Sequence, residues 1–195
     1  MNIFKAIKRE KKYLKRFYIG MVLIAVVLFF VVFLTGLTTP FYLGYLGLME
    51  FLILIAIINK INYHKLTYSC NNNRLRMKNG LFSKEGLIFC DKVVLVHTEK
   101  MEEEMEIILV TTVNFKNKML KPILKSFFKK YPLASQEYIK IKELQPESLY
   151  FYQVIKFGGL NKYMLLDCIY RNCVRATYTE ECIQNIKIAR GQTLV

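Results

Sequence analysis

One carboxyl group in this sequence has surroundings in which carboxyl groups are rare. Glu50 is the only charged residue in the apolar run from Phe41 to Ile58. It lies nine residues into that run, which at a helical rise of about 1.5 Å per residue places it roughly 13 Å deep, near the middle of a bilayer. Because an ionisable side chain is costly there, Glu50 is a candidate functional residue.

Two kinds of role are open to Glu50. As a functional group, its carboxyl could relay protons, bind a cation or pair with a basic group of a partner protein. As a structural group, it would be protonated and would hydrogen-bond to a backbone carbonyl or to the same residue of a second copy.

A cluster of lysines forms the second candidate site. Lys121, Lys125 and Lys129 recur at four-residue steps with apolar residues between them, a pattern that predicts a basic amphipathic helix from about Pro122. Its lysines either remain solvated while the helix caps the domain, or contact anionic lipid headgroups or an acidic partner. The residues predicted for this contact are Lys116, Lys118, Lys121, Lys125, Lys129 and Lys130.

The sulfur and imidazole groups do not follow a usual metal-binding pattern. The chain has five cysteines, an odd number, with no Cys-x-x-Cys pair, and only two histidines, His64 and His97. Free thiols in a reducing compartment are expected, with neither a metal nor another cofactor. The five glutamates of residues 99–106 are expected to lie in a solvated loop.

Motifs of the common enzyme classes are missing from the sequence. It contains no Gly-rich phosphate loop, no Gly-x-Ser-x-Gly and no His-Glu-x-x-His. We therefore do not expect an enzyme. The net charge of +14 points first to the anionic inner leaflet of a membrane, because no nucleic-acid-binding motif accompanies it.

Two apolar runs dominate the chain and position Glu50. Phe17 to Leu37 has no charged residue, and Phe41 to Ile58 follows a break at residues 38–40. Each run is long enough to cross the hydrocarbon core, so residues 17–60 are predicted to form a hairpin of two transmembrane helices. Gly44 and Gly47 are spaced to allow close packing of the two helices.

The basic residues predict the orientation of this hairpin. Residues 1–16 carry seven Lys or Arg against the single acid Glu10, and basic residues resume at Lys60. Positive charge stays on the cytoplasmic side, so both termini are expected to be cytoplasmic in an integral inner (plasma) membrane protein. Residues 1–16 are expected to be a basic interfacial leader, an amphipathic helix along the membrane surface.

Residues 61–142 have the pattern of an antiparallel β domain that also carries the basic helix. Short β-branched and aromatic runs are separated by turn residues, such as Asn71 to Asn73 and Asn79-Gly80. This part of the chain resembles the bacterial pleckstrin-homology-like (PH-like) domain membrane proteins. The residues that carry the resemblance are Tyr68, Arg74, Leu75, Gly80, Leu81, Phe82, Asp91, Lys92 and Val93.

The resemblance covers about 35 residues and implies a curved antiparallel barrel or sheet capped by a helix. It also implies a binding role rather than a catalytic one. The acidic run departs from the pattern of this family, and the last 50 residues or so have no counterpart in it.

Residues 143–195 are expected to form a helical C-terminal extension. Apolar spacing predicts helices from Gln145 to about residue 157 and from Leu160 to Val174, and Thr177 with Glu180 fits a capping box for a third helix. The apolar faces of these helices pack against the domain, a second copy or another protein. The residues predicted for partner docking are Tyr152, Tyr163, Ile169 and Ile183.

The expected fold is therefore a membrane α-helical hairpin followed by an α+β cytoplasmic region. The expected function is a non-catalytic, membrane-anchored binding or scaffold protein, or an accessory subunit of a membrane complex. A transport or channel component that uses Glu50 and a lipid-sensing protein are the alternatives. Expected partners are anionic inner-leaflet lipids and a protein partner or a second copy, whereas nucleic acid is not expected.

Overall fold

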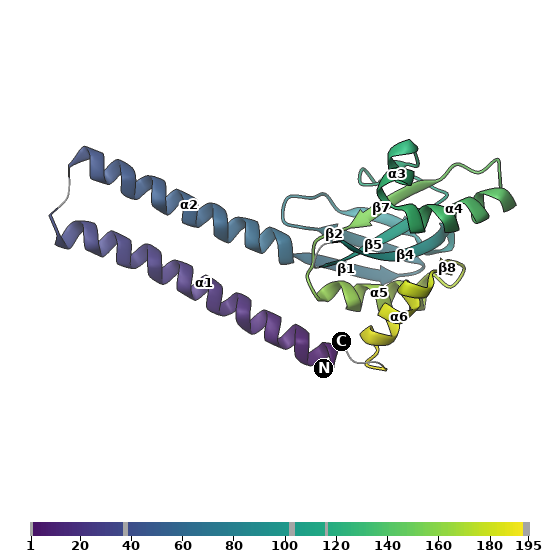
Figure 1. Ribbon diagram of the computed structural model, residues 1–195, viewed down its shortest axis with the longest axis horizontal. Helices are drawn as coiled ribbons and strands as arrows, with labels where there is room; N and C mark the ends of the chain where they lie inside the picture. Colours follow the sequence, from purple (N-terminus) through teal and green to yellow (C-terminus); the bar gives the residue numbers. More distant parts are fainter. Residues whose placement is uncertain (1, 37–38, 102–103, 116, 193–195) are drawn as a thin grey trace.

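The computed structural model describes residues 2–36, 39–101, 104–115 and 117–192. Two long apolar helices project from an α+β domain, as Figure 1 shows. These helices are α1 (Ile3–Leu34) and α2 (Pro40–His64). The predicted order of a helical hairpin followed by an α+β region is confirmed.

Both helices are long and apolar enough to cross a membrane. Their most apolar windows have mean hydropathies of 3.0 and 2.2, and only 0% and 11% of these windows are buried by the rest of the protein. A core helix of a soluble protein would instead be mostly buried. Local sequence also fixes the helix starts, because the Asn2 side chain accepts a hydrogen bond from the Phe4 N–H and Pro40 occupies the first turn of α2.

The two helices cover each other along one stripe. The covered residues recur at alternating steps of three and four, the spacing by which two helices interlock their side chains. In α1 they include Tyr18, Met21, Ala25, Leu28 and Val32, and in α2 Leu46, Glu50, Ile53 and Ile57.

The first sheet of the domain is an antiparallel meander of three strands. Asn72 and Asn73 form the turn between its first two strands with φ values of 52° and 57°, which Asn tolerates better than most residues. The predicted Asn turn is confirmed. The strands are β1 (Leu66–Asn71), β2 (Arg74–Asn79) and β3 (Gly86–Phe89).

The second sheet has five strands in the order β6-β7-β5-β4-β8. All neighbouring pairs are antiparallel except β4 and β8, which are parallel. The two sheets do not close into a barrel within the described residues. A short 3₁₀ helix, η1 (Cys90–Lys92), precedes this sheet, whose strands are β4 (Val93–Met101), β5 (Glu104–Thr111), β6 (Lys121–Pro122), β7 (Phe151–Ile155) and β8 (Thr177–Tyr178).

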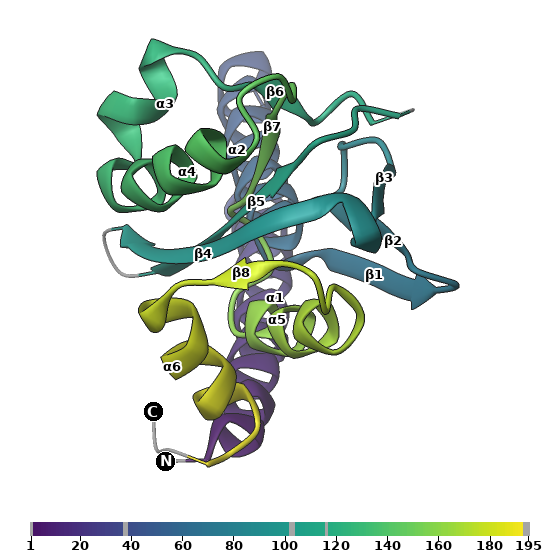
Figure 2. The ribbon, with the colours of Figure 1, turned by 90° about the vertical axis from the view of Figure 1, so that its right-hand side faces the viewer.

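The five-stranded sheet has a hydrophobic core on each face. On one face, Leu95 and Ile108 pack against α3 (Lys125–Lys130) and α4 (Pro132–Leu144). On the other, Val96 and Leu109 pack against the three-stranded sheet and two helices. These two helices are α5 (Asn161–Asn172) and α6 (Glu180–Ala189). Figure 2 shows α3 and α4 above β4, and α5 and α6 below it.

The first part of the C-terminal extension is a strand, so the helix predicted from Gln145 is wrong. Residues 151–155 form β7, which pairs along its length with β5 and at one end with β6. Aromatic and β-branched residues suit such a strand, and pairing with β5 satisfies backbone groups that a local helix would have satisfied internally. The predicted helices near residues 160–174 and after Thr177 are present as α5 and α6.

The acidic segment is also misassigned by the prediction, because its described residues extend strands. Glu99 and Glu106 lie opposite each other in the β4–β5 ladder, and Glu106 is buried. The Tyr131 hydroxyl donates a hydrogen bond to Glu106 Oε2, and Lys156 Nζ lies 3.3 Å from Glu106 Oε1. Neighbouring polar groups therefore hold one acid that the sequence placed in solvent.

Candidate functional site: the junction between hairpin and domain

The domain joins the hairpin without a linker. Helix α2 ends at His64, and strand β1 begins two residues later at Leu66. The Gly80 N–H donates to the Lys65 carbonyl at 2.7 Å, and the Gly158 N–H donates to the Tyr63 carbonyl at 2.8 Å. The end of α2 is therefore hydrogen-bonded to two loops of the domain.

Helix α1 makes a second attachment, through residues that were predicted to lie on the membrane surface. Ile3, Ala6 and Ile7 are buried against α5 and α6. Helix α1 runs unbroken from Ile3 to Leu34, so these residues do not form a separate interfacial helix. The prediction of an interfacial leader is wrong in this respect, because its apolar face packs on protein. The residues covering it are Leu160, Tyr163, Met164 and Ile188.

Glu10 is the polar centre of this attachment. Its carboxylate accepts hydrogen bonds from the Leu160 N–H at 3.4 and 3.2 Å, and His64 Nδ1 lies 3.3 Å from Glu10 Oε1. Leu160 is the N-cap of α5, where a carboxylate interacts favourably with the helix dipole. Gly159, at φ +51°, lies directly against Glu10 and His64, and a Cβ there would collide with both side chains. Glu10 thus joins α1, α2 and α5.

The loop between β2 and β3 is fixed to the other side of α2. The Leu81 N–H donates to Asn62 Oδ1 at 2.7 Å, and Gly80, at φ +96°, packs against the same Asn62. The Phe157 ring lies next to Gly80 and edge-on to the Tyr63 ring, with centroids 5.9 Å apart. Together these contacts attach the last turn of α2 to the β2–β3 loop and to the loop that follows β7.

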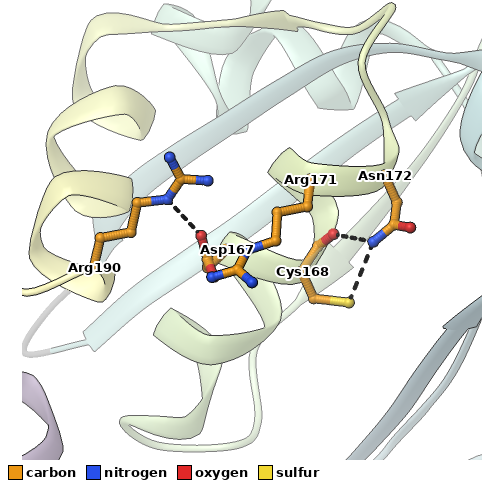
Figure 3. Close-up of polar contacts among 5 residues, drawn as sticks. All are labelled: Asp167, Cys168, Arg171, Asn172 and Arg190. Atoms are coloured by element: carbon orange, nitrogen blue, oxygen red, sulfur yellow. Dashed lines mark hydrogen bonds and ion pairs between the residues drawn. The ribbon is translucent and has the colours of Figure 1, made fainter.

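An ionic clamp, drawn in Figure 3, holds α6 to α5, the two helices on which α1 docks. Asp167 on α5 accepts from Arg190 Nε at 2.7 Å, and Arg171 Nη2 lies 2.6 Å from its other oxygen. The Arg190 guanidinium also stacks over the Tyr170 ring, 4.7 Å from its centroid. A carboxylate that binds two guanidinium groups makes a stronger contact than an isolated surface pair.

Glu50 lies in the stripe where the hairpin helices cover each other, and the two predicted packing glycines lie outside it. Glu50 Oε1 is buried and has no hydrogen-bond partner among the described residues. Gly44 and Gly47 are exposed, and a Cβ on either would meet nothing within 4 Å. The prediction that these glycines let the two helices approach is wrong, because they face away from α1.

The predicted basic helix is shorter than expected and begins later. Lys121 belongs to strand β6, and the helix starts at Lys125. Lys118, Lys121, Lys125, Lys129 and Lys130 are exposed, whereas Lys116 lies outside the described residues. Contact with Lys156 and partial burial lower the pKa of Lys130. Figure 1 shows α3 at the upper edge of the domain, about midway between the end of α2 and the far end of the domain.

Most of the residues predicted to dock a partner pack inside the molecule. Ile169 is completely buried, and Tyr163 lies between the core and helix α1. Tyr152 packs on Phe127 with ring centroids 4.6 Å apart. Only Ile183 of the four is exposed. The alternative of intramolecular packing therefore holds for three of these residues.

A polar pocket of about 410 Å³, which the sequence analysis did not identify, lies between α4 and α6. Its lining includes His97, which is completely buried and whose Nδ1 lies 2.9 Å from the Thr179 hydroxyl. Thr179 is the N-cap of α6 and also accepts from the Cys182 N–H, so the predicted cap at Thr177 is two residues early. Burial lowers the pKa of His97, which therefore stays neutral near pH 7.

The thiols lie in or beside the core between the three-stranded sheet and α5. Cys70 Sγ and Cys90 Sγ are 3.7 Å apart, and burial raises the pKa of Cys70 and that of Cys168 to about 11. Such thiols stay protonated at neutral pH and react slowly. Within the described parts of the chain, no group of three or more His, Cys, Asp or Glu side chains could hold a metal ion.

Comparison with protein-family models, curated proteins and solved structures finds no match to this chain. The resemblance to PH-like membrane proteins therefore stays a prediction.

Proposed function

We propose that this protein is an integral inner-membrane protein that holds a non-catalytic binding domain rigidly at the cytoplasmic face. It would act there as a scaffold or as an accessory subunit of a membrane complex. The observation that carries the proposal is the junction, where α1, α2, α5 and two loops are joined by the Glu10 and Asn62 contacts. A flexible tether would only limit where the domain can diffuse, whereas this attachment also sets its orientation.

The membrane location is supported by the two apolar helices, whose surfaces the protein leaves mostly uncovered. The orientation is supported by the charges at their ends, since basic residues flank the domain end of the hairpin and are missing from the turn. Both termini would then be cytoplasmic, together with the whole domain.

The lysines of α3 support an acidic protein partner more than lipid. Figure 1 shows α3 at the upper edge of the domain, beyond the end of α2 and to one side of the hairpin, so this helix would be set back from the bilayer that the hairpin spans. A basic surface held at that distance is suited to attract an acidic surface of another subunit. We keep the PH-like character of the domain as part of the proposal, since the resemblance implies binding rather than catalysis.

Site-specific photo-crosslinking in living cells tests the binding role. A photoreactive residue at Lys125 of α3 should crosslink to a defined protein, and the same residue at Lys187 of α6, which is also exposed, serves as the matched control. Charge reversal at Lys129 should weaken the adduct at position 125. Equal crosslinking at both positions, or no change after charge reversal, would contradict a partner that binds the α3 lysines.

Epitope tags test the orientation. A tag after Thr39, in the turn, should be accessible in intact spheroplasts, whereas a tag after Gln192 should be accessible only after permeabilisation. The reverse pattern would place the domain outside and refute the proposal.

A transport or channel component is the second candidate, because Glu50 Oε1 is buried in the hairpin without a partner among the described residues. Replacing Glu50 with Gln distinguishes the two functions. A scaffold should keep its abundance and its crosslinking pattern with E50Q, whereas a proton or cation path should lose its flux.

A further inference from the structure

One exposed aromatic residue of the domain lies at the level where the hairpin would leave the membrane. Phe82, in the loop between β2 and β3, has 73% of its surface exposed. Phe115 and Phe128, two other exposed aromatic residues of the domain, have exposed fractions of 44% and 39%. Exposing most of a phenylalanine ring to water is unfavourable, so the exposure of Phe82 suggests that this ring contacts something outside the chain.

The loop that carries Phe82 is held in place at several points. Asn62 of α2 accepts the Leu81 N–H at 2.7 Å, and the Ser83 hydroxyl donates to the Asn79 carbonyl at 2.5 Å. The Phe157 ring also packs against Gly80. The position of Phe82 along the hairpin is therefore set by its attachment to α2.

That position corresponds to the polar layer of a bilayer. The apolar run of α2 ends at Ile58, and Asn62 lies four residues further, or about 6 Å along the helix axis. The headgroup region on each side of the hydrocarbon core is roughly 5–7 Å thick. Figure 1 shows the β2–β3 loop reaching toward the hairpin beside the last turns of α2.

The chemistry of the loop matches that layer. Exposed Lys84 lies two residues after Phe82, and Lys60 and Lys65 flank the attachment point on α2. Aromatic rings are favoured at the interface between lipid and water, and lysines next to them are attracted by anionic headgroups. The same loop thus carries an exposed apolar ring and an exposed lysine, which is followed by the exposed acid Glu85.

We propose that the β2–β3 loop is a membrane-contact site in which Phe82 inserts into the interfacial layer of the inner leaflet and Lys84 contacts anionic headgroups. This inference rests on the proposed function, because the loop has this depth only if the hairpin spans the bilayer. It adds a third membrane attachment beside α1 and α2, which fixes the tilt of the hairpin and domain, as one unit, relative to the membrane surface. The lipid contact therefore lies at this loop, and the lysines of α3 are left to another partner.

The composition of the chain allows a direct test, because the protein contains no tryptophan. Full-length Phe82→Trp protein is reconstituted into vesicles of phosphatidylcholine and phosphatidylglycerol, with bromine atoms placed either near the headgroup or deep in the acyl chains. The fluorescence of the tryptophan at position 82 should have its maximum at a shorter wavelength than that of tryptophan in aqueous buffer. Shallow bromines should quench this fluorescence more than deep bromines do. Lys84→Glu in the same background should reduce the shallow quenching.

Two matched variants separate this inference from the proposed function. Phe30→Trp, near the middle of the apolar run from Phe17 to Leu37, should be quenched most by deep bromines, and Phe128→Trp, on α3, should be quenched by neither. Quenching at position 30 without quenching at position 82 would overturn the loop contact and leave the spanning hairpin intact. No quenching at position 30 would overturn the spanning hairpin and, with it, the loop contact.

Discussion

At the scale of single residues, the buried imidazole of His97 makes the stability of the protein depend on pH. Its imidazole is held in the core next to the Thr179 hydroxyl, and burial lowers its pKa from the ordinary value of 6.5, a shift that Glu181 and Glu137 partly oppose. The unfolded chain therefore binds a proton at a higher pH than the folded chain does. Its contribution to stability is present above about pH 6.5 and is lost as the pH falls from there toward the lowered pKa.

We predict that acidification destabilises the protein in part through His97. The midpoint of thermal unfolding in detergent should fall between about pH 7 and pH 5, and His97→Asn, which cannot titrate there, should show a smaller fall. Every other titratable group is the same in the two proteins, so the difference between their pH profiles reports on His97. Parallel pH profiles for the two proteins would show that His97 does not contribute.

At the scale of elements, the structure assigns the first turns of α1 to the domain. Ile3 is completely buried against α5 and α6, and the adjacent Phe4 is 55% exposed. Replacing Ile3 with Ala should lower the free energy of unfolding by roughly 2–5 kcal/mol, the range for truncating a buried isoleucine. Phe4→Ala, on the exposed side of the same turn, should change it by less than about 0.5 kcal/mol. Chemical denaturation in a mild detergent measures both, and equal effects would show that α1 is not docked.

The Asp167 clamp makes a second prediction at this scale. Asp167→Asn removes the charge that binds Arg171 and Arg190, so α6 should open locally more often. Because Arg190 is about one-third exposed and Arg171 mostly exposed, the expected loss is only about 1 kcal/mol. Hydrogen exchange should be faster in α6 than in the wild type and unchanged in β5. Glu147→Gln, an exposed acid without such a clamp, is the control.

At the scale of the whole molecule, hairpin and domain should form one cooperative unit. Removing residues 1–64 uncovers the apolar surface of Leu160, Tyr163, Met164 and Ile188. The remaining fragment should unfold at a lower temperature than the full chain and should associate. A full chain cut by protease at a site inserted after Thr39 keeps α1 docked and should behave like the intact protein. If the fragment were as stable as the full chain, the junction would be a passive contact.

The sequence alone determined the features that depend on local composition. Two long apolar runs, with Glu50 as their only charged residue, define helices because a stretch of bilayer length can be recognised from its own composition, without a distant partner. Asn72 and Asn73 define a turn because positive φ is a property of single residues. Helices α5 and α6 were also predictable, because apolar spacing after Leu160 and a threonine and glutamate pattern near residue 180 are local signals for a helix.

Tertiary structure decided everything that depends on a partner distant in the chain. Tyr152 and Ile155 have helical spacing but form a strand, because their backbone pairs with β5. The sequence could not reveal this pairing, since the partner residues lie more than 40 positions away. Gly44 and Gly47 suit helix packing, yet which face of α2 meets α1 depends on how the junction orients both helices. Likewise, the sequence shows Glu10 only as one acid among basic residues. Its position at the centre of the junction depends on its contacts with Leu160 and His64, which are distant in the chain.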